Sequence, residues 1–203
     1  MSLLVAMLLA QDPAAEALRR LGERMKDVGT LSCRIRQIRK TALIETPLVS
    51  AGTMSYRREP GRLVFRLTEP RTSEIHMDRT AYQVYRPYEK RLERIEFEDD
   101  ALTSQLLMLF DPKPEAMGKA FKMSRMDGDI LLEPLDEKVK KRLASLSLTL
   151  KGDEIRRLRY VQADGDEVSF ELSDVKLNPP LAADAFELKV PEGTRVLTHK
   201  VGR

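Results

Sequence analysis

Few side chains in this sequence are placed to do chemistry. The chain contains one cysteine and two histidines. His76 falls in the middle of a strand-like stretch and His199 in the C-terminal tail, and neither has an acid or a nucleophile near it in sequence. Cys33 alternates with Leu31 and Ile35, which is typical of a thiol on the apolar face of a strand. The sequence therefore predicts a buried thiol and gives no sign of a nucleophile–base pair.

The acidic clusters favour structural roles. Residues 127–129 and 164–166, both Asp-Gly-Asp, lack the further spaced oxygens and the closing glutamate of a calcium loop, so they predict tight hairpin turns. Residues 98–100, Glu-Asp-Asp, are typical of a helix start. The sequence contains no phosphate-binding glycine loop, nucleophile elbow or His-Glu-x-x-His motif. We therefore expect no enzyme, no metal site and no cofactor.

Composition describes one ordinary globular domain. Of 203 residues, 42% are hydrophobic and 33% charged, and the formal net charge is +3. No apolar run reaches the roughly 18 residues that a membrane-spanning helix requires. The basic stretches at 34–40 and 156–159 interleave cations with aliphatic residues, which favours strands with one solvated face over a nucleic-acid surface. A weak attraction to an anionic membrane or an acidic partner remains the alternative.

The first eleven residues differ in character from the domain predicted at residues 12–203. Residues 3–10 form an uninterrupted apolar run that ends at Ala10 and is followed by polar Gln11 and Asp12. This favours a short secretory signal peptide over the alternative, an apolar start to the first helix.

Two helices are expected. Asp12 caps the first and Pro13 suits its first position, and its apolar residues recur at spacings of three and four until Gly29. The second follows Asp99 and Asp100 and is apolar on more than one face up to Phe110. Such a helix either lies in the core or covers an apolar hollow as a lid. The proline-rich and glycine-containing chain after it, residues 112–118, is expected to have little regular structure.

Most of the remaining chain alternates between apolar and polar residues, with turn signals between the runs. Strands with one apolar and one wetted face belong to antiparallel sheets, and a large meander must curl or close to protect its edges. The fold class is therefore mainly β with some α. Whether the curled sheet keeps a hollow or is filled by its own side chains is left open by the pattern. The alternating apolar residues are Leu31, Cys33, Ile35, Leu63, Phe65, Leu67, Ile75, Met77, Tyr82, Val84, Leu146, Leu148, Leu150, Val168, Phe170 and Leu172.

The order of several short motifs resembles the LolA family of periplasmic outer-membrane lipoprotein carriers. Residues 48–54, Leu-Val-Ser-Ala-Gly-Thr-Met, are similar to that family's small-residue and glycine start of a strand. Residues 57–65 carry basic residues, a proline and then an apolar–aromatic strand, and Ile-His-Met-Asp at 75–78 and Tyr-Arg-Pro at 85–87 follow in the expected order. Residues 186–196 match the spacing of Phe, Pro, Gly and Val closely.

The resemblance implies a half-open antiparallel β-barrel with an N-terminal helix and a short helical lid. It also implies a periplasmic monomer that receives lipoproteins from an inner-membrane exporter and carries their acyl chains to an outer-membrane acceptor. In this family an arginine before the proline ties the lid to the barrel; here Arg58 is the nearest candidate, with Arg57 as the alternative. The apolar residues expected to bind acyl chains are Phe65, Leu67, Ile75, Met77, Tyr85, Leu106, Leu109, Phe110, Leu146 and Leu148.

A rival interpretation stays open. A lipid-responsive regulator or an assembly scaffold of the same fold would bind protein partners and transport no cargo.

Overall fold

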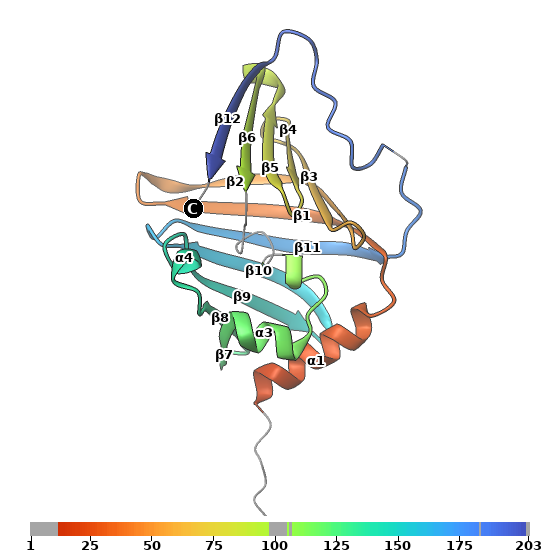
Figure 1. The fold of residues 1–203 in the computed structure, drawn as a ribbon, viewed down its shortest axis with the longest axis vertical. Coiled ribbons are helices and arrows are strands. Elements are labelled where there is room, and N and C mark those ends of the chain that lie inside the picture. The colour runs from red at the N-terminus through yellow and green to blue at the C-terminus, as the bar shows by residue number, and fades with distance from the viewer. Residues whose placement is uncertain (1–11, 98–104, 106, 183, 202–203) are drawn as a thin grey trace, which may run out of the picture.

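A single sheet organises the chain (Figure 1). The computed structural model describes residues 12–97, 105, 107–182 and 184–201. Twelve strands lie in the order β12-β6-β5-β4-β3-β2-β1-β11-β10-β9-β8-β7. Their bounds are β1 Thr30–Thr41, β2 Ile44–Arg57, β3 Arg62–Glu69, β4 Ser73–Met77, β5 Ala81–Arg86, β6 Arg91–Phe97, β7 Phe121–Met126, β8 Asp129–Pro134, β9 Leu143–Lys151, β10 Glu154–Gln162, β11 Glu167–Leu177 and β12 Arg195–Val201.

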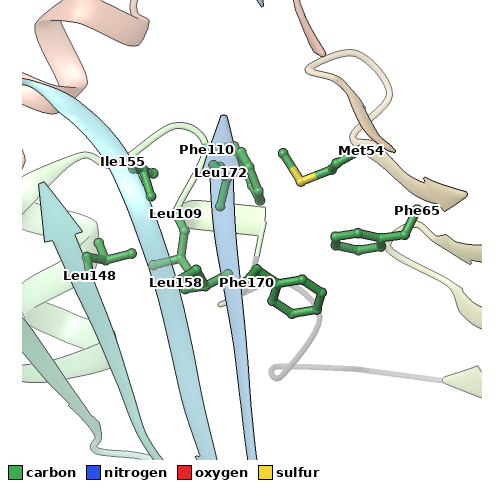
Figure 2. Close-up of a pocket in the computed structure, with 9 residues that line it drawn as sticks. All are labelled: Met54, Phe65, Leu109, Phe110, Leu148, Ile155, Leu158, Phe170 and Leu172. Atoms are coloured by element: carbon green, nitrogen blue, oxygen red, sulfur yellow. The ribbon is translucent and has the colours of Figure 1, made fainter. Parts of the chain in front are cut away.

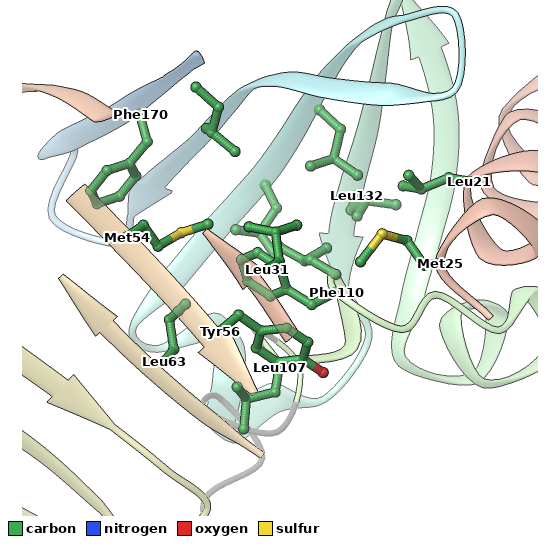
Figure 3. Packing of buried hydrophobic residues seen from close by; sticks show 14 of the residues in the cluster. Leu21, Met25, Leu31, Met54, Tyr56, Leu63, Leu107, Phe110, Leu132 and Phe170 are labelled. Carbon is green, nitrogen blue, oxygen red and sulfur yellow. The ribbon is translucent and has the colours of Figure 1, made fainter. Parts of the chain in front are cut away.

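The sheet bends until strands that are not neighbours touch. Phe65 of β3 and Phe170 of β11 are separated by two strands in the sheet, yet their rings stack with centroids 5.0 Å apart. Such a contact requires a strongly concave face. Since β7 and β12 end the sheet without pairing to each other, the barrel is half-open, as predicted. The concave face carries the main apolar cluster (Figure 3).

The first helix, α1 (Pro13–Met25), forms as its sequence predicts. The Asp12 carboxylate accepts a hydrogen bond from the Ala14 amide at 2.9 Å, which satisfies one of the free donors of the first turn. Its buried stripe packs toward the sheet, where α1 contacts β7 and α3 (Pro114–Ala120). Among the described residues, no helix is long and apolar enough to cross a membrane. The described part of the chain also contains a short 3-10 turn at Pro87–Glu89 and the helix α4 (Glu137–Lys140).

The helix α3 corrects one prediction. Residues 112–118 were expected to have little regular structure, but a helix begins at Pro114. Proline suits the first turn of a helix, where its missing amide hydrogen is not needed. Met117 of α3 is fully buried against the core, so tertiary packing holds this short helix in place despite Gly118.

One edge of the sheet departs from the antiparallel prediction. β12 pairs with β6 in parallel, with Arg195 opposite Arg91 and His199 opposite Ile95. Residues 178–194, apart from 183, link β11 to β12 and pass outside β3–β6, as the blue segment in Figure 1 shows, so that β12 reaches the far edge of the sheet. The other strand pairs are antiparallel, as expected.

Gly52 of β2 allows a close approach between strands. A Cβ at Gly52 would lie 2.0 Å from the backbone oxygen of Arg66 on β3. The β2–β3 register shifts between Ala51 and Gly52, which marks a bulge at the same place. A bulge increases local bending, so Gly52 helps the sheet to curl over its concave face.

We expect Gly52→Ala to destabilise the protein by about 2–3 kcal/mol, because backbone atoms of β3 must move to admit the new methyl group. Urea unfolding followed by circular dichroism measures the change. Gly118→Ala is the matched control, since the nearest atom to its added Cβ is the Met123 Cε at 3.8 Å and alanine favours the helix. An equal stability loss in both variants would contradict the close-approach explanation.

Candidate functional site

The concave face contains a small apolar cavity (Figure 2). Its volume is about 10 Å³, close to the minimum that one water molecule needs. Its walls come from β2, β3, β9, β10 and β11 and from the segment after β6. The lining residues are all apolar: Met54, Phe65, Leu109, Phe110, Leu148, Ile155, Leu158, Phe170 and Leu172.

Two of these lining residues belong to the predicted lid. Part of the predicted lid helix, including residues 98–104 and Leu106, lies outside the described residues; Gln105, Leu107 and Met108 are helical. Leu109 and Phe110 follow them and point into the concave face, where they are 1% and 4% exposed (Figure 2). The Phe110 ring stacks on Tyr56 of β2 with centroids 4.8 Å apart. The hollow is therefore filled, in part by the lid itself.

Phe110 also borders a second small cavity. This cavity, of about 20 Å³, lies between α1 and the sheet and is lined in part by Leu21, Met25 and Leu31. Phe110, Ile155 and Leu172 line both cavities. Phe110 thus forms part of the wall between the two spaces, the second of which is also lined by Arg24, Asp153 and Glu154.

Arg58 contacts the residue that follows Phe110 and also the end of α1. The Arg58 Nη1 lies 2.9 Å from the Asp111 Oδ1, directly after Phe110. The other guanidinium nitrogens point to the C-terminal end of α1: Nε donates to the Val28 carbonyl at 2.9 Å and Nη2 donates to the Met25 carbonyl. A cation at a helix C-terminus is also favoured by the helix dipole. Arg58, the nearest candidate in the sequence, thus joins α1, β2 and the lid in one contact.

The next residue of the lid segment is also held by close packing. A Cβ at Gly22 of α1 would lie 2.4 Å from the carbonyl oxygen of Pro112. Only a residue without a side chain permits α1 and the lid segment to approach this closely. Asp111 and Pro112 therefore form a fixed end from which the preceding residues extend into the hollow.

The end of the concave face away from α1 is polar. Arg39 of β1 and Tyr160 of β10 both pair with Val168, so they share one row of the sheet. Tyr82 of β5 lies close enough across the concave side for the ionised form of Tyr160 to raise its pKa. Burial is the main cause and raises the pKa of Tyr82 to about 12; burial also raises that of Tyr160. A phenol is neutral near pH 7 even without this shift, so both hydroxyl groups are able to donate hydrogen bonds.

The structure gathers most of the predicted acyl-binding residues on one face. Phe65, Leu109, Phe110 and Leu148 line the first cavity. Leu67, Met77 and Leu146 are buried in the same apolar cluster, and Ile75 packs against it.

The prediction that Tyr85 lines the hollow is wrong. Tyr85 pairs with Glu74, whereas the neighbouring Val84 pairs with Ile75, so Tyr85 lies on the convex side of β5. It is buried there, outside the main apolar cluster, on the face that residues 178–194 cross. The sequence shows that an aromatic residue on a strand is apolar, but it does not show on which face of the sheet the side chain lies.

Five lining residues were missed by the predicted acyl-binding set: Met54, Ile155, Leu158, Phe170 and Leu172. Phe170 and Leu172 were recognised as apolar strand residues and could have been included. Ile155 and Leu158 are three apart, because the β9–β10 register shifts between Ile155 and Arg157. This bulge hides the period of two that would have placed both residues on one face.

The residues with reactive side chains lie in structural positions. Cys33 is buried opposite Met54, and burial raises the pKa of its thiol to about 12, so the thiolate is scarce at neutral pH. His76 is buried on the convex side, and its Nε2 lies 3.1 Å from the Glu74 Oε2. The described ranges contain no group of three or more His, Cys, Asp or Glu residues able to hold a metal ion.

This architecture matches a known protein family. The family model for the outer membrane lipoprotein carrier protein LolA matches residues 26–189, which include the curved sheet up to β11, Arg58 and the lid segment. The chain belongs to the LolA family. No curated protein matches the sequence.

Several solved structures are similar to this chain at low sequence identity. An uncharacterized conserved protein from Thermus thermophilus is 11% identical with a TM-score of 0.51, over 92% of this chain and 99% of that one. A LolA superfamily protein from Nitrosomonas europaea is 14% identical with a TM-score of 0.44, over 86% and 97% of the two chains. A DUF1329 family protein from Desulfovibrio piger is 11% identical with a TM-score of 0.49, over 87% and 98%. At these identities the likeness concerns the fold alone.

The contact between Arg58 and Asp111 predicts a matched pair of variants. Asp111→Asn removes the charge that faces Arg58 and keeps the bonds from Arg58 to α1, so we expect faster uptake of a fluorescent acyl probe and a stability loss below about 1 kcal/mol. Arg58→Met removes all three contacts, so it should speed uptake similarly and cost about 2–3 kcal/mol of stability. Stopped-flow binding and urea unfolding measure the two effects. Unchanged uptake rates in both variants would show that this contact does not hold the lid.

Proposed function

We propose that this LolA-family chain is a periplasmic carrier that binds the acyl chains of lipoproteins, or of a related lipid, and moves them from the inner towards the outer membrane. Its partners would be acylated lipoproteins or lipids, an inner-membrane exporter and an outer-membrane acceptor, and it would act as a monomer. Family membership and the apolar concave face support this proposal. The family is one of carriers, and no cofactor or metal enters the proposed mechanism.

The position of Phe110 between two small cavities, one lined only and the other mainly by apolar residues, is the observation that carries the proposal. Ligand pockets usually span about 300–1,000 Å³, far more than the 10 Å³ and 20 Å³ found beside Phe110. An acyl chain therefore enters only when the lid side chains leave. Leu109 and Phe110 are suited to this exchange, because they are apolar and lie in a short segment rather than in a strand. The closed form would be the empty carrier, with its own side chains in the place of cargo.

A length requirement follows from this exchange. Exposing Leu109 and Phe110 costs about 1.5–3 kcal/mol for each side chain, and each buried methylene returns about 0.8 kcal/mol. An acyl chain must then bury about four to eight methylenes before binding becomes favourable. Membrane lipids and lipoproteins carry chains longer than this limit, so the lid would exclude short apolar molecules and admit long ones.

The polar end of the hollow suits the other end of such a ligand. Tyr82 and Tyr160 provide neutral hydroxyl groups, and Arg39 provides a positive charge on the same side of the sheet. An ester or amide next to an acyl chain accepts hydrogen bonds from groups of this kind. We therefore place the acyl tail toward α1 and the polar head near Tyr82 and Tyr160.

Release requires that binding stay moderate. Arg58 and Asp111 are 23% and 30% exposed, so their ion pair is partly solvated and weak enough to break and re-form. When cargo leaves, Leu109 and Phe110 return to the hollow and recover their burial. The closed lid would thus stabilise the empty carrier and favour transfer to an acceptor.

A transfer assay tests the proposed function. Vesicles loaded with a fluorescent acylated peptide are mixed with the protein, and the soluble fraction is separated by centrifugation. We expect the protein to bring the acylated peptide into the soluble fraction, whereas the same peptide without its acyl chain should give no complex. In water, affinity should appear beyond about four to eight methylenes and then rise about fourfold for each further methylene.

A regulator or scaffold gives a different result in this assay. It would bind vesicles or protein partners and leave the soluble fraction without acylated peptide. Affinity that does not depend on chain length would also contradict the carrier mechanism.

A further inference from the structure

The hairpin between β1 and β2 exposes apolar side chains that no part of the described chain covers. Leu43 at its tip is 94% exposed, and Ile44, Leu48 and Val49 are 46%, 50% and 41% exposed. Nine large apolar residues are exposed in the described part of the molecule, and four of them lie within residues 43–49. Single exposed apolar residues are ordinary, but a cluster of this kind marks an interaction surface.

The apolar residues occupy both faces of the hairpin. Leu48 pairs with Arg39 on the concave side, whereas the adjacent Val49 pairs with Ile38 and points to the opposite face. Leu43 lies in the turn itself. A protein partner with a flat surface would cover one face and leave the other in water. Leu48 and Val49 lie at the level of Arg39 and Ile38, so they would rest in the interfacial region while Leu43 and Ile44 reach the hydrocarbon. The interfacial region of a bilayer surrounds a ribbon on both faces, so this distribution favours a lipid bilayer.

Charged residues form a level behind the tip. Arg39 and Lys40 lie three to four residues before Leu43, or roughly 10–13 Å along an extended strand. Both are exposed, and Lys40 lies 3.5 Å from Glu167. Glu45 on β2 falls at the same level as Lys40, because Thr41 pairs with Ile44 and Arg39 with Leu48. The charges therefore remain near lipid headgroups when the tip inserts about 5–10 Å. The Glu167 Oε2 also lies 2.7 Å from the Arg159 Nη2, so three cations stand near this level against two carboxylates, and the excess positive charge favours anionic lipids.

The hairpin is located at the polar end of the hollow. β1 begins beside α1 and runs away from it, so its turn lies at the end of the concave face that carries Arg39, Tyr82 and Tyr160 (Figure 1). A bilayer that held the tip would face this end of the hollow. Lipid contact at this position would shorten the path between membrane and cavity.

We propose that residues 42–44 at the tip of the β1–β2 hairpin insert into the surface of a bilayer that contains anionic lipids, with Arg39 and Lys40 at the headgroups. This membrane contact goes beyond acyl binding and does not depend on it. A protein partner or a second copy of the chain are the other occupants that the experiment distinguishes.

The absence of tryptophan from the natural chain permits a direct test. Leu43→Trp places one fluorophore at the tip, and Val196→Trp places one at an exposed control position on β12 that is 54% exposed. On addition of vesicles of phosphatidylethanolamine and phosphatidylglycerol, we expect a blue shift and quenching by brominated lipids for the tip variant only. Phosphatidylcholine vesicles should give a weaker response. Equal responses from both positions, or none from the tip, would overturn the proposal.

A second pair of variants measures affinity. Leu43→Ser combined with Ile44→Ser should lower binding to the anionic vesicles at least tenfold, whereas Leu135→Ser, at a position that is 46% exposed on another loop, should leave it unchanged. Acyl-probe binding in water should be the same in all these variants, which separates this proposal from the carrier function. Vesicle binding that survives the double substitution would overturn the insertion. A change confined to sedimentation velocity, with no wild-type vesicle binding, would assign the tip to self-association instead.

Discussion

The burial of Leu109 and Phe110 in the concave face is the contact on which the rest of the structure depends. A half-open sheet with an apolar inner surface exposes that surface to water unless something covers it. Here the cover comes from the protein's own lid segment, and Phe110 stacks on Tyr56 while it separates two small cavities. The curved sheet, the glycine that lets α1 approach Pro112 and the arginine at the lid's end all serve to hold these two side chains in place.

Two kinds of interaction with different strengths act on the lid. Burial of the two side chains provides most of the free energy of closure, since each contributes about 1.5–3 kcal/mol. The Arg58–Asp111 pair fixes the position of Asp111 but contributes little free energy, because a partly exposed ion pair contributes about 0–1 kcal/mol. Arg58 also donates to the carbonyls of Met25 and Val28. In the opening that we propose, these bonds would remain when Asp111 leaves, so no buried charge would be left unpaired.

The sequence predicted the features that depend on neighbouring residues, namely helices, strands and most strand pairs. The apolar stripe of α1, the alternation in β3 and the antiparallel pairing of most strands follow from periodicity, and the LolA-like resemblance supplied the half-open barrel. The errors arose where distant segments decide the outcome. Tyr85 lies on the convex face because residues 178–194 cover that face, and β12 pairs in parallel because the same segment carries it to the far edge. Neither fact is visible in the residues around Tyr85 or Arg195.

The residues that line the hollow were predicted only where apolar and polar residues alternate along a strand. Phe65 and Leu148 were found because their strands keep a period of two, whereas Ile155 and Leu158 were missed at a bulge that breaks it. Whether the hollow is open or filled depends on how far the lid reaches across the sheet. That distance is set by the packing of Gly22 against Pro112 and by Arg58, which come together only in the folded chain.

The central claim is that cargo and Phe110 occupy the same space in turn. Phe110→Trp would place the molecule's single tryptophan in the hollow. Titration with a long-chain acyl ligand should shift its emission to the red and increase quenching by iodide, because the indole moves into water as the acyl chain replaces it. If the ligand binds while the emission stays blue and protected from iodide, the lid side chain does not give way to cargo and the account is wrong.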